Sequence, residues 1–105
     1  MSWQSIAKDG LEHGMTSSDF ETEAMRPVSV QCDDTFLYIT LADSRQIRAP
    51  LWWYPFLYKA KPSQRAKAEL EFAGIWWPDL DDGISVKAVL LGWKAPGATE
   101  PQRAA

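Results

Sequence analysis

The chain of 105 residues has room for one domain with a single core and none for a second. An apolar fraction of 46% without low-complexity tracts excludes a disordered chain, and no apolar run approaches the roughly 20 residues that span a bilayer. The net charge of −3 argues against a basic nucleic-acid-binding surface, and the single cysteine, Cys32, excludes an intrachain disulfide. We therefore expect a folded protein of the reducing cytoplasm, without an export signal, a membrane span or direct contact with nucleic acid.

Residues 1–27 are an acidic stretch that we expect to form a helical extension. Five acids and two bases give this stretch alone a charge of −3. Ser2 can cap a first helix that ends at Gly10. Ser18 and Glu21 have the spacing of a capping box, which predicts a second helix.

From Val28 the apolar residues recur at every second position, which is the period of a β-strand. The pattern predicts three antiparallel strands, over 28–32, 35–41 and 45–51. In the second strand both faces are largely apolar, because Phe36 and Tyr38 alternate with leucine and isoleucine. We therefore expect either the N-terminal extension or another chain to cover the face that carries Phe36 and Tyr38.

Beyond the three strands, the sequence predicts a helix over 62–72, a short strand over 75–77 and a helix over 86–91. Pro62 suits the first turn of the first helix, and Gly74 is expected to end it. Ser85 and Gly92 are expected to cap the last helix. The predicted fold class is therefore α+β, a single domain over 28–94 in which a small antiparallel β-sheet is packed by two or three short helices. The tail over 95–105 is expected to be disordered.

Two aromatic phrases hold four of the six tryptophans, Trp52-Trp53-Tyr54-Pro55-Phe56 and Trp76-Trp77-Pro78. Neighbours on an extended segment face opposite ways, so Trp52 and Trp76 are expected to point outward if Trp53 and Trp77 point inward. Exposed aromatic side chains are typical anchors of protein interfaces. The candidate partner-binding residues are Trp52, Tyr54, Phe56, Tyr58, Trp76, Phe36 and Tyr38. The alternative is that the N-terminal helices cover these side chains, and the sequence leaves both open.

The Asp79–Asp82 loop is the one candidate for a metal site. An EF-hand-like loop would need an acid or amide where this chain has Gly83 and a glutamate where it has Leu90. We expect the aspartates to accept hydrogen bonds from backbone amides of the turn instead. His13 and Cys32 have no second ligand or triad partner at motif distance. We therefore expect no metal, no cofactor and no catalytic residue, and we do not expect an enzyme.

A series of short motifs runs from Val28 to Gly92 in a specific order. They are Pro50-Leu51, Trp53-Tyr54-Pro55, Gln64-Arg65, Gly74-Ile75, Trp77-Pro78, Leu80-Asp81, Ile84-Ser85-Val86 and Leu90-Leu91-Gly92. Together they resemble the DUF2442-type bacterial domain of unknown function, although the chain departs from that pattern at Trp76, Gly83, Ser44 and Phe56. The resemblance implies a small α+β fold, occurrence in bacterial and prophage genomes, and genomic pairing with small proteins in suspected toxin–antitoxin modules. It supplies no catalytic residue.

We expect a protein of bacterial or prophage origin that acts through protein–protein contact. The most concrete form is one member of a toxin–antitoxin-like pair or an inhibitor of a host complex. The first alternative is a structural domain that only self-associates, for example as a homodimer. The second is a small-ligand or metal-binding domain that uses the Asp79–Asp82 loop.

Overall fold

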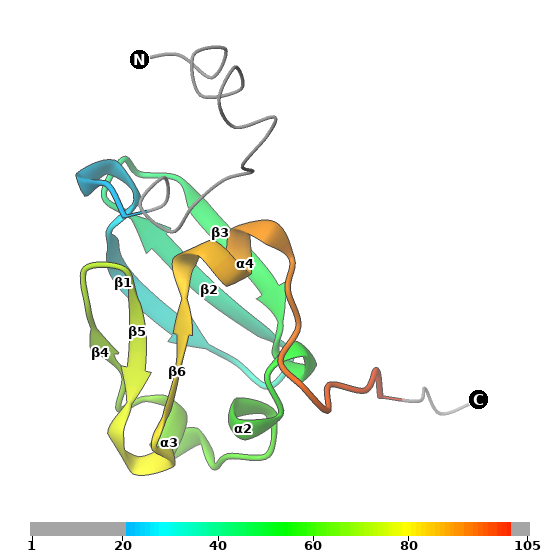
Figure 1. Cartoon of the computed structure of the whole chain (residues 1–105). Helices are drawn as coiled ribbons and strands as arrows, with labels where there is room; N and C mark the ends of the chain where they lie inside the picture. The colour runs from blue at the N-terminus through cyan, green and yellow to red at the C-terminus, as the bar shows by residue number, and fades with distance from the viewer. Residues whose placement is uncertain (1–20, 102–105) are drawn as a thin grey trace.

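The computed structural model describes residues 21–101, which fold into two small antiparallel sheets connected by short helices (Figure 1). The predicted helix at Ser2 lies outside these residues, as does the capping box at Ser18. Between residues 21 and 26 the chain forms the 3₁₀ turn η2 (Glu23–Met25) rather than an α-helix. No helix in the described part of the chain is long and apolar enough to cross a membrane.

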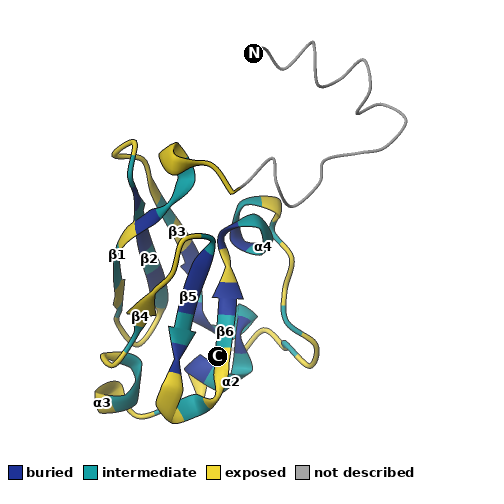
Figure 2. Cartoon of the chain, turned by 60° about the vertical axis from the view of Figure 1, so that its left-hand side comes forward, coloured by how far each residue is buried: buried dark blue, intermediate teal, exposed yellow. Residues whose placement is uncertain are grey.

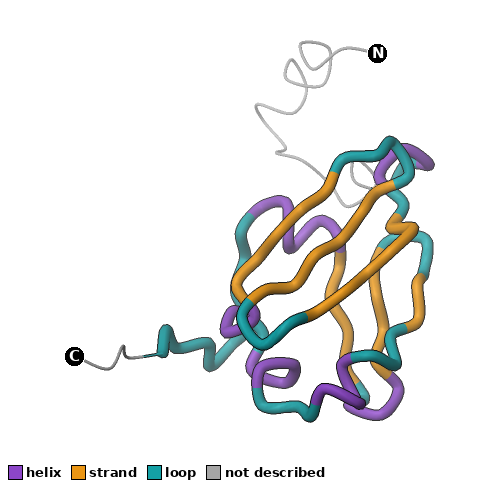
Figure 3. The backbone as a smooth tube through the Cα atoms, turned by 180° about the vertical axis from the view of Figure 1, so that it is seen from behind, coloured by secondary structure: helices purple, strands orange, loops and turns teal. Residues whose placement is uncertain are grey.

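The first sheet consists of β1 (Pro27–Cys32), β2 (Phe36–Leu41) and β3 (Gln46–Pro50), in the order β1-β2-β3. Figure 3 shows these strands side by side from behind. Each strand agrees with the sequence prediction to within about one residue at either end, well inside the usual uncertainty of such boundaries. Leu37, Ile39 and Leu41 are completely buried, as the alternation on the second strand predicts.

The second sheet consists of β4 (Glu69–Leu70), β5 (Gly74–Trp77) and β6 (Asp82–Ser85), in the order β4-β5-β6. Only β5 was predicted. Gly74 begins this strand, whereas the sequence predicts that it ends a helix. Its lack of a side chain allows β6 to approach closely. A Cβ added at Gly74 would lie 2.5 Å from the carbonyl oxygen of Ile84, so a side chain there would push the two strands apart.

The helix predicted over 62–72 is wrong beyond Arg65, where α3 (Pro62–Arg65) ends. The residues after it favour a helix by propensity, but they offer no large apolar stripe for a helix to bury: Ala66 is exposed, and Leu70 is 45% exposed. Pairing of β4 with β5 satisfies the backbone of this segment instead, with Leu70 opposite Ile75. Tertiary pairing therefore outweighs local helix propensity here.

Short helices cap the space between the two sheets. The 3₁₀ turn η3 (Leu51–Trp53) and α2 (Pro55–Tyr58) lead from the first sheet to α3, and α2 and α3 lie at one end of the domain (Figure 1). The 3₁₀ turn η4 (Pro78–Leu80) connects β5 to β6. The last helix, α4 (Val86–Leu91), covers the opposite end.

The predicted ends of α4 are confirmed in detail. The hydroxyl oxygen of Ser85 accepts a hydrogen bond from the amide of Ala88 at 3.0 Å, which satisfies one of the free N–H groups of the first turn. Gly92 ends the helix with a φ of 74°, in the left-handed region that glycine adopts without strain. Beyond it, the amide of Ala95 donates to the carbonyl of Trp53 at 2.9 Å and holds the start of the C-terminal tail against η3.

The core lies between the inner faces of the sheets. Figure 2 shows buried residues concentrated on β2 and β5, while β1 and β4 are largely exposed or half-buried. The largest completely buried side chain is Trp77, and the rest of the core is mainly aliphatic. The edge strands β1 and β4 therefore border the core without being fully enclosed in it.

Candidate interaction groove

The structure divides the four tryptophans of the two aromatic phrases differently from the sequence prediction. Trp77 is completely buried and Trp76 is half-buried, which follows the expected alternation on β5. Trp52 and Trp53 lie in η3 rather than on an extended segment, and both are half-buried. The prediction of opposite directions therefore fails for this pair, because successive residues of a 3₁₀ helix are about 120° apart around its axis.

Two of the candidate partner-binding residues are less accessible than the sequence suggests, because Tyr54 is buried in the core and Phe56 is half-buried against it. Tyr54 is only 3% exposed, and its hydroxyl has no hydrogen-bond partner among the described residues. Burial raises the pKa of Tyr54 to about 12. Phe56 packs edge-on against the Trp77 ring with centroids 5.7 Å apart. Of the candidates between residues 52 and 58, Tyr58 alone is well exposed, at 40%.

The outer face of the first sheet carries Phe36 and Tyr38, as predicted, but polar neighbours partly cover them. The guanidinium carbon of Arg48 lies 4.1 Å from the centre of the Phe36 ring. The hydroxyl of Tyr38 donates to the Asp33 carboxylate at 2.9 Å, and this bond raises the pKa of Tyr38. Hydrogen bonds from the amides of Phe36 and Thr35 are the main reason why the pKa of Asp33 is lowered. Both aromatic side chains are consequently half-buried.

Several exposed apolar side chains were not among the predicted candidates: Val28, Leu70, Phe72, Leu91 and Trp93. Trp93 follows the glycine that ends α4, and this position beyond a predicted helix end was the available signal that it lies outside the core. Leu70 falls within the helix predicted over 62–72, but it lies in β4 in the structure. Its exposure could not be predicted without knowing that β4 is an edge strand.

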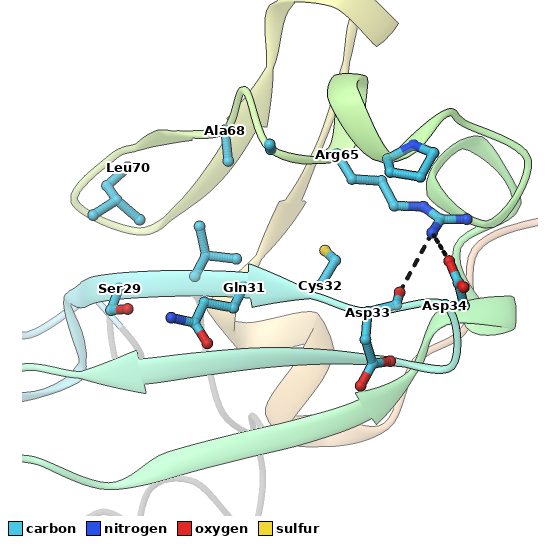
Figure 4. A pocket seen from close by; sticks show the side chains of 11 residues that line it. Ser29, Gln31, Cys32, Asp33, Asp34, Arg65, Ala68 and Leu70 are labelled. Atoms are coloured by element: carbon cyan, nitrogen blue, oxygen red, sulfur yellow. Dashed lines mark hydrogen bonds and ion pairs between the residues drawn. The ribbon is translucent and has the colours of Figure 1, made fainter.

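A groove runs between β1 and the segment from α3 to β4 (Figure 4). Its volume is about 820 Å³. The residues that line it come from two stretches far apart in the sequence. They are Ser29, Val30, Gln31, Cys32, Asp33 and Asp34 on one side, and Pro62, Arg65, Ala66, Ala68 and Leu70 on the other. Figure 4 shows Leu70 and Ala68 above β1 and Cys32 directed upward into the space, with Ser29 and Gln31 directed away from it.

One wall of the groove is an open strand edge. The amide of Asp33 donates to the carbonyl of Phe36 at 3.0 Å, which closes the β1–β2 hairpin. Hydrogen-bonded and non-hydrogen-bonded pairs alternate along an antiparallel ladder, so Gln31 directs its backbone groups toward β2. By the same alternation Val30 and Cys32 direct theirs toward the open edge. No strand in residues 21–101 pairs with that edge.

An arginine clasp closes one end of the groove. The Arg65 side chain is only 9% exposed and donates through Nε to the carbonyl of Leu57 at 2.9 Å and through Nη2 to that of Tyr58 at 3.0 Å. Its Nη1 contacts the carboxylate of Asp34 at 3.0 Å and the carbonyl of Asp33 at 3.4 Å. The backbone carbonyl of Arg65 in turn accepts a hydrogen bond from the indole N–H of Trp77. The clasp therefore fixes α2, α3 and the β1–β2 turn relative to one another.

Cys32 contributes to the groove as an apolar group. Burial raises the pKa of its thiol to about 11, so the thiol is protonated at neutral pH. The nucleophilic form of cysteine is the thiolate. In this state the side chain offers a small hydrophobic contact next to Val30, and the groove gains no reactive group from it.

The acidic loop is held by contacts within the domain. A carboxylate oxygen of Asp82 accepts a hydrogen bond from the amide of Gly83 at 2.8 Å, and Asp79 forms an ion pair with Lys67 at 3.3 Å. Asp81 has a φ of 51°, in the left-handed region that aspartate tolerates. Residues 21–101 contain no group of three or more histidine, cysteine, aspartate or glutamate side chains placed to hold a metal ion. His13 lies outside the described residues.

Comparisons with known proteins identify a family and a fold. The family described as "Protein of unknown function (DUF2442)" matches residues 27–95. No curated protein matches the chain. An uncharacterised protein from Chromobacterium violaceum, solved by solution NMR, superposes with a TM-score of 0.66 at 18% identity, covering 92% of this chain and 88% of that one. A crystal structure of a protein of unknown function from Rhodospirillum rubrum gives a TM-score of 0.61 at 19% identity over 70% of this chain and 93% of that one. At such identities the likeness establishes the fold alone.

Proposed function

The chain belongs to the DUF2442 family, and we propose that it is a small protein-interaction module whose contact surface is the groove beside β1. In its most concrete form it is one member of a toxin–antitoxin-like pair, or an inhibitor of a host complex, of bacterial or prophage origin. We place it in the cytoplasm, because a lone unpaired cysteine suits a reducing compartment. The groove replaces Tyr54 and Phe56 as the proposed centre of contact.

The observation that carries this proposal is the combination of an open strand edge with an apolar groove next to it. Unpaired backbone groups on an edge strand favour pairing with another chain, and soluble proteins usually shield such edges. Here Val28, Leu70 and Phe72 are exposed along or near the two edge strands, at 40%, 45% and 48%. Exposed apolar groups beside open backbone groups are the arrangement that peptide-binding sheets use.

Affinity purification from a bacterial host tests the proposal with one groove variant and one matched control. Leu70→Glu places a charge in the groove wall at a position that is already 45% exposed, so the fold should survive. Leu91→Glu makes the same change at a similarly exposed leucine, 41%, on α4. Circular dichroism and melting temperature check that all three proteins are folded.

We expect at least one protein that copurifies with the wild type and with Leu91→Glu but not with Leu70→Glu. Isothermal titration with that purified protein should then show a loss of affinity of about tenfold or more for the groove variant, which corresponds to about 1.4 kcal/mol. Capture that is the same for all three chains would contradict the groove as the contact surface. A self-associating structural domain would instead show concentration-dependent sedimentation that Leu70→Glu abolishes.

A further inference from the structure

We propose that the open edge of β1 receives an extended segment of a partner protein as a fourth strand of the first sheet, and that this segment is apolar at alternate positions and basic near the β1–β2 turn. This inference rests on the proposed function and specifies the partner's chemistry. It follows from three features of the groove, which are its backbone groups, its side-chain alternation and its charge.

The backbone groups of β1 set the mode of binding. Val30 and Cys32 direct their N–H and C=O groups toward the edge that no described strand occupies, whereas those of Gln31 are engaged with β2. A chain segment that lies along this edge at the usual strand spacing can pair with both open residues. Backbone pairing of this kind supplies affinity without demanding a particular sequence.

The side chains around the edge set the pattern of the partner segment. On the groove side Val30 and Cys32 are joined by Ala68 and Leu70, all of which are apolar or behave as such. On the opposite face of β1 lie the polar side chains of Ser29 and Gln31 (Figure 4). Because successive residues of an added strand also alternate between these faces, every second residue of the partner meets apolar neighbours. A segment of four to six residues with that alternation fits the length of β1 (Pro27–Cys32).

The charge at the turn end selects a basic partner residue. Asp33 and Asp34 carry two negative charges there, and Arg65 supplies one positive charge, which leaves a net charge of −1. The Arg65 side chain is 9% exposed, and its guanidinium already donates to three carbonyls and to Asp34, so it offers little to an incoming carboxylate. The Asp34 side chain is 89% exposed and can accept a second cation. A lysine or arginine in the partner is therefore favoured and an acid is disfavoured.

The test uses the full chain, labelled with ¹⁵N, and synthetic ten-residue peptides that alternate valine and threonine. In the first pair, one peptide carries its lysines at the N-terminal end and the other carries them at the C-terminal end. The second pair carries glutamates in the same places. A further peptide has the lysines but groups its valines together. Amide hydrogen exchange is measured residue by residue with and without each peptide. Affinity is measured by titration at low and high salt.

We expect the alternating lysine peptides to slow exchange at the amides of Val30 and Cys32 and to leave the already protected amide of Gln31 unchanged. They should bind about tenfold more tightly than the glutamate peptides at low salt, and the difference should shrink at high salt. Leu70→Glu should weaken binding of the alternating peptides, and Leu91→Glu should not.

Strand addition is overturned if no alternating peptide binds, or if binding leaves the Val30 and Cys32 amides unprotected. Protection that appears without peptide and grows with protein concentration would assign the edge to a second copy of this chain and would also overturn the proposal. Failure of strand addition can be told apart from failure of the proposed function. A host protein captured in a Leu70-dependent way that leaves both amides unprotected would refute strand addition alone.

Discussion

Trp77 serves two purposes at the scale of a single residue. Its ring is completely buried and contacts Phe56, and its indole N–H donates to the carbonyl of Arg65 at 3.0 Å. Because that carbonyl belongs to the last residue of the short helix α3, it has no partner within the helix. Trp77 therefore fills the core and satisfies the end of α3 with one side chain.

Replacing Trp77 by alanine should lower the free energy of unfolding by about 3–5 kcal/mol, which is the usual cost of emptying a large aromatic site in a core. Trp76→Ala is the matched control, because Trp76 is the adjacent half-buried residue of the same strand, and it should cost clearly less, about 1–2 kcal/mol. Urea unfolding followed by circular dichroism measures both values. Equal destabilisation by the two variants would show that Trp77 contributes no more to stability than its half-buried neighbour.

Tyr54 predicts a pH dependence of stability in the alkaline range. Burial raises its pKa from 10.0 to about 12 in the folded state, so the folded chain holds the phenol proton more tightly than the unfolded chain. The stabilisation of the folded state that results is complete below pH 10.0 and is lost as the pH rises through about 12. The raised pKa of Cys32 also stabilises the folded state, and this stabilisation is lost at lower pH, between the ordinary pKa of 9.0 and about 11.

Tyr54→Phe should therefore lose less stability than the wild type between pH 10 and pH 12, as measured by urea midpoints at fixed pH. At pH 7 the substitution should change stability by no more than about 1 kcal/mol, because the hydroxyl has no hydrogen-bond partner among the described residues. A large loss at pH 7, or parallel alkaline curves for the two proteins, would contradict this role.

Arg65 organises the structure at the scale of elements. Its four side-chain contacts join α2, α3 and the β1–β2 turn, which are separated by up to 32 positions in the sequence. A guanidinium can donate in several directions within one plane, whereas a lysine ammonium is a compact point charge. The clasp therefore depends on arginine rather than on positive charge alone.

Arg65→Lys should lower the free energy of unfolding by about 2 kcal/mol, since carbonyls that Arg65 now satisfies would lose their donors. Arg45→Lys is the matched control, because Arg45 is 55% exposed and its one ion pair within residues 21–101 is with Asp43, and it should cost less than about 0.5 kcal/mol. Chemical denaturation gives both values. If the two substitutions cost the same, the clasp contributes no more than an exposed ion pair.

The first sheet and α4 could be predicted from the sequence because their signals are local. Alternation of apolar residues defined β1 to β3, and Ser85 with Gly92 defined the ends of α4. The second sheet could not, because β4 spans only Glu69–Leu70 and exists through its pairing with Trp76 and Ile75. The groove depends on that misread segment, since Ala68 and Leu70 form its upper wall. Sequence reasoning therefore found the aromatic residues and missed the open edge beside them.

At the scale of the whole molecule, the described domain begins earlier than the three strands suggest. The carbonyls of Ala24 and Arg26 accept hydrogen bonds from the amides of Asp43 and Ala42, at 3.1 and 2.8 Å, and Pro27 is a buried residue of β1. Residues up to 27 were expected to form a separable extension, but deleting all of them would cut into the first sheet. The cut that tests the role of the N-terminal part lies after residue 20.

A chain of residues 21–105 should fold, with a melting temperature within a few degrees of the full chain, because the core and both sheets lie within it. We also predict that it self-associates and that its tryptophan emission moves to the red, since residues 1–20 include the apolar side chains Trp3, Ile6, Leu11 and Phe20 with three acids and one lysine. The guanidinium of Arg48 lies over the Phe36 ring on the outer face of the first sheet, and none of the ion pairs within residues 21–101 includes it. It is the contact we expect for those acids.

Sedimentation velocity and fluorescence on the truncated and full chains measure these effects. If acids of residues 1–20 lie against Arg48, 1 M salt should shift the emission of the full chain toward that of the truncated one. At that ionic strength the Debye length is only about 3 Å, so the attraction between exposed charges is largely screened. Arg48→Gln should have the same effect at low salt, and Arg45→Gln, at the exposed Asp43 pair, should not. If the truncated chain instead stays monomeric, with an emission that is weaker by the loss of Trp3 but not shifted in wavelength, residues 1–20 do not cover the domain. Those residues would then be free to contact a partner while β1 receives its strand.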